Sequence, residues 1–373
     1  GIGRGYGLAY YLYNNNNNDI EITAICDPIL EKMVFAKILI KDICNRTSKT
    51  YNEPKMYKNY KDILSDNNVD AIVIATPHWW NAEMGYEACL KKKYVFCEKP
   101  LGINIIDGRK LVNIVKKNNI IFQSGFHNKT GNVPLQVKTF IENNMSRIKK
   151  IEIQGGTCGS YYSNNNETIP LSHITKKPLI NYNDFNLFLG HTNNYISSLA
   201  ENNNGEQITY HSDFISRISD NKFPKEEWRN YFNYGNGSIT SIGVHLFELM
   251  VFIMGFDNNN IGPYKIEPSD TDYGTKIYYK KDNNNIILEH TTGDYTLKFI
   301  DIDNNWLTYK LSSSLVESNL TLDFTISPET DLRQKNMDNW INNIVNNSHI
   351  DSLYYVERGH YASILSYLFN LAH

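Results

Sequence analysis

Short apolar runs alternate with stretches of helical periodicity along the first third of the chain. The runs at residues 20–26, 69–75, 94–97 and 120–124 have the length and composition of buried strands. Between them, at residues 30–44, 82–91 and 107–117, apolar side chains recur at the spacing of an α-helix. Strands that alternate with helices favour βα units around a parallel sheet. We therefore predict an α/β domain over residues 1–125.

The pattern changes after Gly125. A helical stretch at residues 133–143 precedes an apolar run at 148–155, and alternating segments recur at 275–279, 286–291, 295–300, 306–311 and 320–324. Such alternation is typical of antiparallel strands with one covered face. Further helices are predicted at 239–254, 332–345 and 356–371. Residues 126–373 are thus expected to form an α+β domain with a large open, mostly antiparallel sheet, whose last helix is free to pack back on the first domain.

Charge and composition exclude several kinds of partner. The net charge of −3, from 37 basic and 40 acidic residues, gives no excess of cations for nucleic acid or an anionic membrane. No apolar run reaches the roughly 20 residues that span a bilayer. The five scattered cysteines favour a reducing compartment and no metal site, which predicts a cytoplasmic location. Because the sequence opens with a motif at Gly1, it leaves open whether a targeting segment precedes that motif.

A glycine-rich run, GIGRGYG, opens the chain before a helical stretch. Gly1, Gly3, Arg4 and Gly5 would let backbone N–H groups approach a pyrophosphate at the helix N-terminus, as in a Rossmann domain. The motif is one residue short, because Tyr6 stands where the third glycine of GxGxxG belongs. A plain glycine turn is therefore the alternative.

Asp27 comes at the end of the run at 20–26, 24 residues after Gly3. An acidic residue near this distance binds the adenosine ribose hydroxyls in Rossmann domains. Its carboxylate would repel a 2′-phosphate, so the sequence favours NAD as cofactor over NADP. The alternative is a helix N-cap before Pro28.

Two loops follow the runs at 69–75 and 94–97. The first contains Thr76, Pro77, Trp80 and Asn81, and the second contains Glu98 and Lys99 before a proline. Open α/β sheets bind ligands at the carboxyl ends of their strands, so we assign these residues to a cofactor site. Without context, such residues also form ordinary solvated turns.

The stretch VDAIVIATPHWWNAEMGYEACLKKKYVFCEKPLG, followed by FQSGFHNK, resembles the glucose-fructose oxidoreductase and inositol dehydrogenase family, Gfo/Idh/MocA. The resemblance continues in DFNLFLG, in YGNGSITSIGVHLFELMVFIMG and around Gly359. It implies an NAD(P)-binding Rossmann domain and a sheet domain for substrate binding and oligomerisation, with substrate between them. It also implies that Lys99 orients substrate and assists proton transfer, that Thr76, Pro77 and Glu98 line the cofactor, and that His245 is the catalytic histidine.

These roles suit the oxidation of a secondary alcohol, which removes a hydride from carbon and a proton from oxygen. Histidine titrates in the range such a base needs, although a structural histidine on an apolar helix is the alternative for His245. The motifs also depart from the family. Ser241, the third member of the candidate catalytic set, replaces an aspartate and cannot act as its acid. Further replacements are Asn81 for histidine, Lys129 for arginine and Glu248 for aspartate.

The sequence therefore predicts an NAD-dependent dehydrogenase that acts on a sugar, polyol or sugar derivative. An NAD-retaining glycosidase of the same fold is one alternative. A catalytically degenerate protein that binds a dinucleotide is another, motivated by Ser241, Asn81 and the short glycine motif. The expected partners are a small carbohydrate or polyol and further copies of the chain, as a dimer or tetramer.

Overall fold

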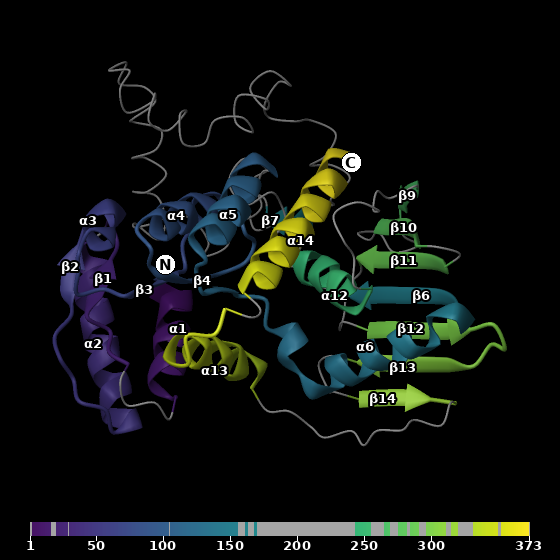
Figure 1. Cartoon of the computed structure of the whole chain (residues 1–373), viewed down its shortest axis with the longest axis horizontal. Helices are drawn as coiled ribbons and strands as arrows, with labels where there is room; N and C mark the ends of the chain where they lie inside the picture. Colours follow the sequence, from purple (N-terminus) through teal and green to yellow (C-terminus); the bar gives the residue numbers. More distant parts are fainter. Residues whose placement is uncertain are drawn as a thin grey trace, which may run out of the picture. The chain divides into compact units, whose positions relative to one another are not determined.

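The computed structural model divides the chain into two compact units (Figure 1). The first contains Gly1–Gly125 and Arg333–His360, and the second contains Phe126–Asn186, Glu226–Leu332 and Tyr361–His373, as far as these ranges are described. Residues 333–360, which the sequence prediction placed in the second domain, thus belong to the first unit. The structure describes residues 2–15, 20–28, 30–103, 105–155, 161–162, 168–169, 243–254, 265–268, 275–281, 284–290, 296–310, 315–319, 331–349 and 352–372.

The first unit is built on parallel strands, as predicted. β1 (Ala24–Cys26) pairs with β2 (Lys55–Tyr57), and β3 (Ala71–Ile74), β4 (Tyr94–Cys97) and β5 (Phe122–Ser124) form a three-stranded sheet in that order. The helices of this unit are α1 (Ile2–Tyr13), α2 (Leu30–Thr47), α3 (Tyr60–Leu64), α4 (His78–Leu90), α5 (Ile105–Asn118) and α13 (Leu332–Val345).

Both faces of β4 are covered, which explains its continuous apolar run. Val95 and Cys97 pack with Leu111 of α5 in one core cluster. Phe96 points to the opposite face and packs with α1 and with Trp340 of α13, whose ring centroid lies 5.6 Å away. Helix α13 therefore packs against this sheet, although more than 200 residues of sequence separate the two.

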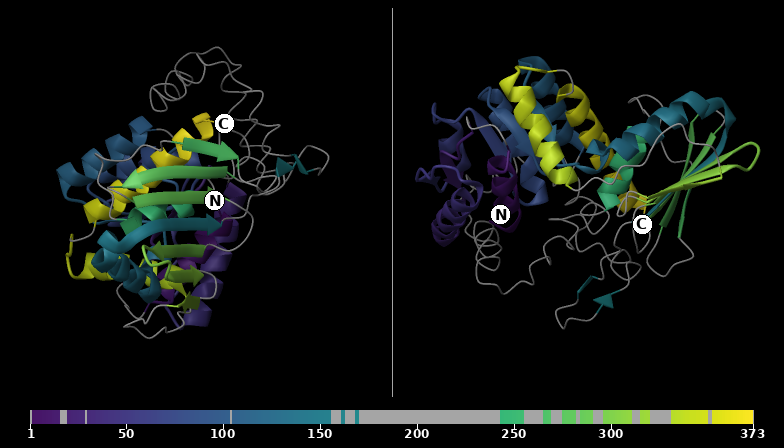
Figure 2. Two further views of the ribbon diagram at one scale, coloured as in Figure 1. Left: turned by 90° about the vertical axis from the view of Figure 1, so that its right-hand side faces the viewer. Right: turned by 90° about the horizontal axis from the view of Figure 1, so that it is seen from below.

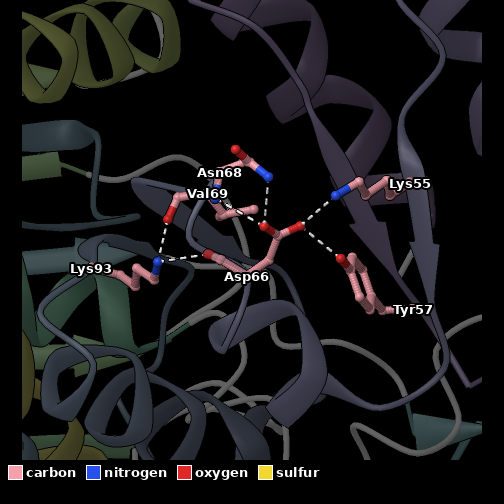
Figure 3. A network of polar contacts seen from close by, with 6 residues as sticks. All are labelled: Lys55, Tyr57, Asp66, Asn68, Val69 and Lys93. Carbon is pink, nitrogen blue, oxygen red and sulfur yellow. Dashed lines mark hydrogen bonds and ion pairs between the residues drawn. The ribbon is translucent and has the colours of Figure 1, made fainter.

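Asp66 fixes the connection from β2 to β3 (Figure 3). Its carboxylate accepts hydrogen bonds from the Asn68 backbone N–H at 2.9 Å, the Tyr57 hydroxyl at 2.7 Å and the Lys55 ammonium at 3.2 Å. These donors, the Asn68 N–H foremost, hold the pKa of the Asp66 carboxyl well below its usual range. Lys93 ties the same turn to the start of β4 by donating to the carbonyls of Asp66 and Val69.

A seven-stranded sheet organises the second unit (Figure 2). Its neighbours are antiparallel except for the parallel pair β6 and β11, which confirms the predicted mostly antiparallel sheet. The strand predicted at 320–324 lies outside the described residues. The strand order is β14 (Leu315–Ser318), β13 (Trp306–Lys310), β12 (Thr296–Asp301), β6 (Ile148–Gly155), β11 (Asn284–His290), β10 (Thr275–Lys281) and β9 (Lys265–Pro268).

The register places apolar residues on one face of this sheet. A single row across the central strands consists of the buried Tyr309, Leu297 and Ile153. The next row, on the other face, pairs the exposed Lys298 with Glu152. Helices α6 (Asn132–Asn144) and α12 (Val244–Met254) share a core cluster with the apolar face. The other described elements are β7 (Tyr161–Tyr162), β8 (Thr168–Ile169), two short 3₁₀ turns at Asn128–Thr130 and Met145–Arg147, and α14 (Ser352–Ala372).

None of the helices in the described part of the chain has the length and apolar character that crossing a membrane requires.

Helices α5 and α14 touch where α5 has a glycine. A Cβ atom on Gly108 would lie 2.1 Å from Nδ1 and 2.5 Å from Cε1 of His360. The His360 side chain is buried, and this burial, together with the charge of Arg109, lowers its pKa to about 4. The contact therefore leaves no room for a Cβ at position 108, and burial favours the neutral form of the imidazole.

Gly108→Ala should destabilise the protein by about 1–3 kcal/mol, because the new methyl group overpacks a rigid contact with His360. The free energy of unfolding, from urea denaturation, measures the effect. Gly7→Ala in α1 is the matched control, because a Cβ there meets nothing within 4 Å and should gain helix propensity. Equal losses in the two variants would contradict the proposed overpacking.

His360 should also make stability depend on pH. Between pH 6.5 and about 4 the unfolded chain binds a proton at this histidine that the folded chain does not bind, so the free energy of unfolding should fall as the pH is lowered, by about 3 kcal/mol in all. His360→Leu should remove this contribution. Glu83, whose pKa burial raises to about 7, acts in the opposite sense, so the test is the difference between the two proteins at each pH. A constant difference would show that His360 does not titrate on unfolding.

Candidate active site

Three loops meet at the carboxyl ends of β3, β4 and β5. Parallel strands end at the same edge of a sheet, where α/β proteins bind their ligands. The Glu98 N–H donates to the carbonyl of Ile74 at 2.9 Å, and the Gly125 N–H donates to the carbonyl of Cys97 at 2.7 Å. Backbone hydrogen bonds thus continue past the strands and hold the three loops side by side.

The turn from Glu98 to Pro100 lies at the centre of these loops. Its Lys99–Pro100 peptide bond is cis, and the Lys99 N–H donates to Glu98 Oε2 at 3.3 Å. A Cβ on Gly125 would lie 3.0 Å from both the Cα and Oε2 of Glu98. A side chain at position 125 would crowd the turn, so glycine suits the close approach of the residue after β5.

Asn81, in the first turn of α4, connects the two predicted loops. Its side chain is 0% exposed. Nδ2 donates to the carbonyls of Glu98 at 2.9 Å and Pro100 at 3.0 Å, and Oδ1 accepts from the Thr76 hydroxyl at 2.9 Å. The structure therefore brings together Thr76, Asn81, Glu98 and Lys99, with Pro77 at the N-cap of α4.

Trp80 has a different neighbourhood. Its ring centroid lies 6.2 Å from that of Tyr60 in α3, and the Tyr60 hydroxyl donates to Glu83 Oε1 at 3.2 Å. The sequence did not single out Tyr60 or Glu83, since neither lies in a loop after a strand. The ring contact of Trp80 with Tyr60 is therefore one between α4 and α3.

The glycine motif lies inside α1 rather than in a loop before it. The helix begins at Ile2, so Gly3, Arg4 and Gly5 occupy its first turn, and Gly1 lies outside the described residues. Backbone N–H groups in the first turn of a helix have no partner within the helix, and a Cβ on Gly5 would meet nothing within 4 Å. The expected loop was wrong, but the first turn of a helix also suits an anionic phosphate.

Asp27 directly follows β1, and its N–H donates to the carbonyl of Tyr57 at 3.2 Å. Helix α2 begins only at Leu30, so Pro28 is not its first residue. This weakens the N-cap alternative and leaves the carboxylate at the carboxyl end of a parallel strand. Asp27 and the loops after β3 and β4 thus each follow the carboxyl end of a parallel strand.

His245 in α12 carries the second half of the candidate chemistry. The imidazole is 9% exposed, and its ring centroid lies 5.7 Å from Phe126 and 5.4 Å from His127. His127 was missed in the sequence, although it stands in the family-like segment FQSGFHNK. Ser241 and the DFNLFLG segment lie outside the described residues.

Lys129 and Glu248 form an ion pair in the second unit. Lys129 Nζ lies 3.8 Å from Glu248 Oε1, and the two side chains are 3% and 0% exposed. The pair links the turn after Phe126 to α12. Two departures from the family pattern thus retain opposite charges side by side. In the described part of the chain, no group of three or more His, Cys, Asp or Glu residues is placed to hold a metal ion.

A family model described as "Oxidoreductase family, NAD-binding Rossmann fold" matches residues 1–126. This region belongs to the Gfo/Idh/MocA oxidoreductase family. The chain is also similar to inositol 2-dehydrogenase of Salmonella paratyphi B, with 27% identity over 129 residues, which are 34% of this chain and 35% of that protein.

Two further similarities extend beyond the Gfo/Idh/MocA match. A glycosyl hydrolase family 109 protein of a Shewanella species is 20% identical over 297 residues, or 73% of this chain and 59% of that protein. The structure of scyllo-inositol dehydrogenase from Lactobacillus casei with bound NAD(H) and scyllo-inositol aligns with 98% of this chain and 93% of that one, at a TM-score of 0.58 and 13% identity. That similarity shows the fold. The first curated relatives are matched over only 25–35% of their own length.

Glu248→Gln should destabilise the protein by about 3–5 kcal/mol, because it removes a negative charge beside a buried ammonium. The matched control is Glu317→Gln on the sheet, where Lys310 and Glu317 are 40% and 47% exposed and the loss should stay below about 1 kcal/mol. Urea denaturation measures both. The double variant Lys129→Met/Glu248→Leu should regain most of the stability, and similar small losses in both single variants would show that the buried pair carries no special weight.

Proposed function

We propose that the protein is an NAD-dependent oxidoreductase that acts on a sugar, polyol or sugar derivative. The observation that carries the proposal is the hydrogen-bonded junction of the Thr76 loop with the Glu98 to Pro100 turn at the carboxyl edge of a parallel sheet. This junction lies in the region that matches an oxidoreductase family with an NAD-binding Rossmann fold. The resemblance also leads us to propose a cytoplasmic homo-oligomer, dimer or tetramer.

Residues of the first unit would hold the cofactor. Backbone N–H groups at Gly1, Gly3, Arg4 and Gly5 would bind the pyrophosphate, and Asp27 would accept hydrogen bonds from the adenosine ribose. The Asp27 carboxylate would repel a 2′-phosphate, which favours NAD over NADP. Thr76, Pro77, Trp80 and Glu98 would line the nicotinamide half. The chemistry that NAD supplies when bound is acceptance of a hydride from a substrate carbon.

Two side chains of this chain would manage the proton and the charge. His245 would take the proton from the substrate hydroxyl, because a neutral imidazole is basic near neutral pH. Lys99 would orient that hydroxyl and stabilise the negative charge that develops on its oxygen. The Ser241 hydroxyl would supply a hydrogen bond and no acidic proton, so the proposal gives it a lesser role than the aspartate it replaces.

The test begins with fluorescence titrations that measure the binding of NADH and of NADPH to the purified protein. NADH should bind at micromolar concentration and NADPH at least about 10-fold more weakly, and Asp27→Asn should narrow that difference because it removes the repelling charge. With a polyol found by screening, His245→Ala and Lys99→Ala should each lower kcat by about 10²–10⁴-fold, with NADH affinity unchanged in His245→Ala.

Other results would point elsewhere. If neither nucleotide binds, the dinucleotide site is lost and the degenerate binding protein becomes the better hypothesis. Release of nitrophenol from nitrophenyl glycosides, with bound NAD and no net NADH, would favour the NAD-retaining glycosidase, which the similarity to the family 109 protein supports. If His245→Ala leaves a verified polyol oxidation unchanged, its assigned role is wrong.

A further inference from the structure

The Asn81 amide uses both of its donors on a single turn. Nδ2 donates to the carbonyls of Glu98 and Pro100, at 2.9 and 3.0 Å, and these two carbonyls flank Lys99. Since both partners are carbonyl oxygens, the nitrogen of the amide must face the turn. Its oxygen faces the Thr76 hydroxyl. The side chain is 0% exposed, so it offers no surface to a ligand.

We propose that Asn81 is a positioning residue for Lys99 and does not itself contact the cofactor. This inference rests on the proposed function, in which Lys99 acts on the substrate. It replaces the expectation that Asn81 belongs to the cofactor-binding residues. By fixing the carbonyl before Lys99 and the carbonyl after it, the amide sets the direction in which the Lys99 side chain leaves the backbone.

Other contacts support the start of the turn, among them the Cys97 thiol, which donates to the Glu98 carbonyl at 3.5 Å. The Glu98 N–H is held by the carbonyl of Ile74 at 2.9 Å, and Gly125 lies against the Glu98 Cα. These contacts fix where the turn begins, whereas its exit through Pro100 is held by Asn81. A substitution at position 81 should therefore shift Lys99 without removing the strands around it.

An amide suits this task better than the residues nearest to it in chemistry. A carboxylate of the same shape would place oxygen against two carbonyl oxygens and donate to neither. An imidazole, the side chain that the family resemblance leads one to expect here, has two N–H donors only when it is protonated. The asparagine amide does not titrate, so its two hydrogen bonds to the turn are independent of pH.

The experiment compares Asn81→Leu and Asn81→Asp with Asn336→Leu. Asn336 is the matched control, because it is 1% exposed and its amide also bonds within the first unit, to the Ser124 carbonyl and to Gln123. Both Asn81 variants should lower kcat for polyol oxidation by at least about 10-fold, since displacing a reacting group by about 1 Å costs up to 10²-fold. The dissociation constant of NADH should change by less than about 3-fold, and Asn336→Leu should change neither quantity.

A second measurement does not depend on turnover. Mass spectrometry after brief labelling with acetic anhydride gives the reactivity of Lys99 relative to that of Lys93. Lys93 is the reference because its ammonium group donates to the carbonyls of Asp66 and Val69, away from the turn. The ratio should change at least about 3-fold in the Asn81 variants and stay constant in Asn336→Leu. If the protein oxidises no polyol, the proposed function fails, and this ratio still decides whether Asn81 positions Lys99.

Asn81→His is a third variant, which tests the proposal through its pH dependence if the others do not fold. Its Lys99 labelling ratio and its kcat should approach the wild-type values at pH 5.5 and depart from them at pH 8, because only the protonated imidazole can donate to both carbonyls. An unchanged labelling ratio in every Asn81 variant would overturn the proposal. So would weaker NADH binding with kcat unchanged, which is the signature of a direct cofactor contact.

Discussion

The parallel pairing of β3, β4 and β5 is the constraint on which the candidate site depends. Because the three strands run in the same direction, the loops that follow them share one edge, and residues distant in sequence become neighbours there. The pairing continues into the loops through the bonds from Glu98 to Ile74 and from Gly125 to Cys97. The Asn81 amide can reach across two loops only because the strands have already placed them side by side.

Buried polar groups in both units are held by specific partners, and these partners restrict what can be substituted. In the first unit, Asn336 connects β5 to α13 through Ser124 and Gln123. In the second unit, Lys129 and Glu248 place opposite charges together away from water. Such groups are costly to bury alone, so each is best understood together with its partner.

The sequence predicted most elements but not what covers them. The bounds of β4 and α13 agree with prediction, since a polar residue or turn signal interrupts the apolar pattern at each end. The place of α13 against Phe96 was missed, because periodicity identifies an apolar face and not its partner. β2 was missed since two of its three residues are exposed. The hydrogen bonds of Asn81 and the contact between His127 and His245 depend on tertiary packing that no local pattern records.

The hypothesis of a degenerate protein rests in part on residues that depart from the family pattern. The structure makes one of them, Asn81, weaker evidence for that hypothesis. Position 81 has asparagine where the family resemblance leads one to expect histidine. The Asn81 amide nevertheless makes three hydrogen bonds that join the two loops of the candidate site. Lys129 and Glu248 both differ from the family pattern, yet they remain an ion pair. The altered residues thus have polar partners in this chain, either the backbone and a hydroxyl or each other. Since a buried polar group without a partner is destabilising, folding alone could preserve such contacts. Folding does not require that the two carbonyls held by Asn81 flank Lys99, and the proposed positioning role of Asn81 accounts for that arrangement.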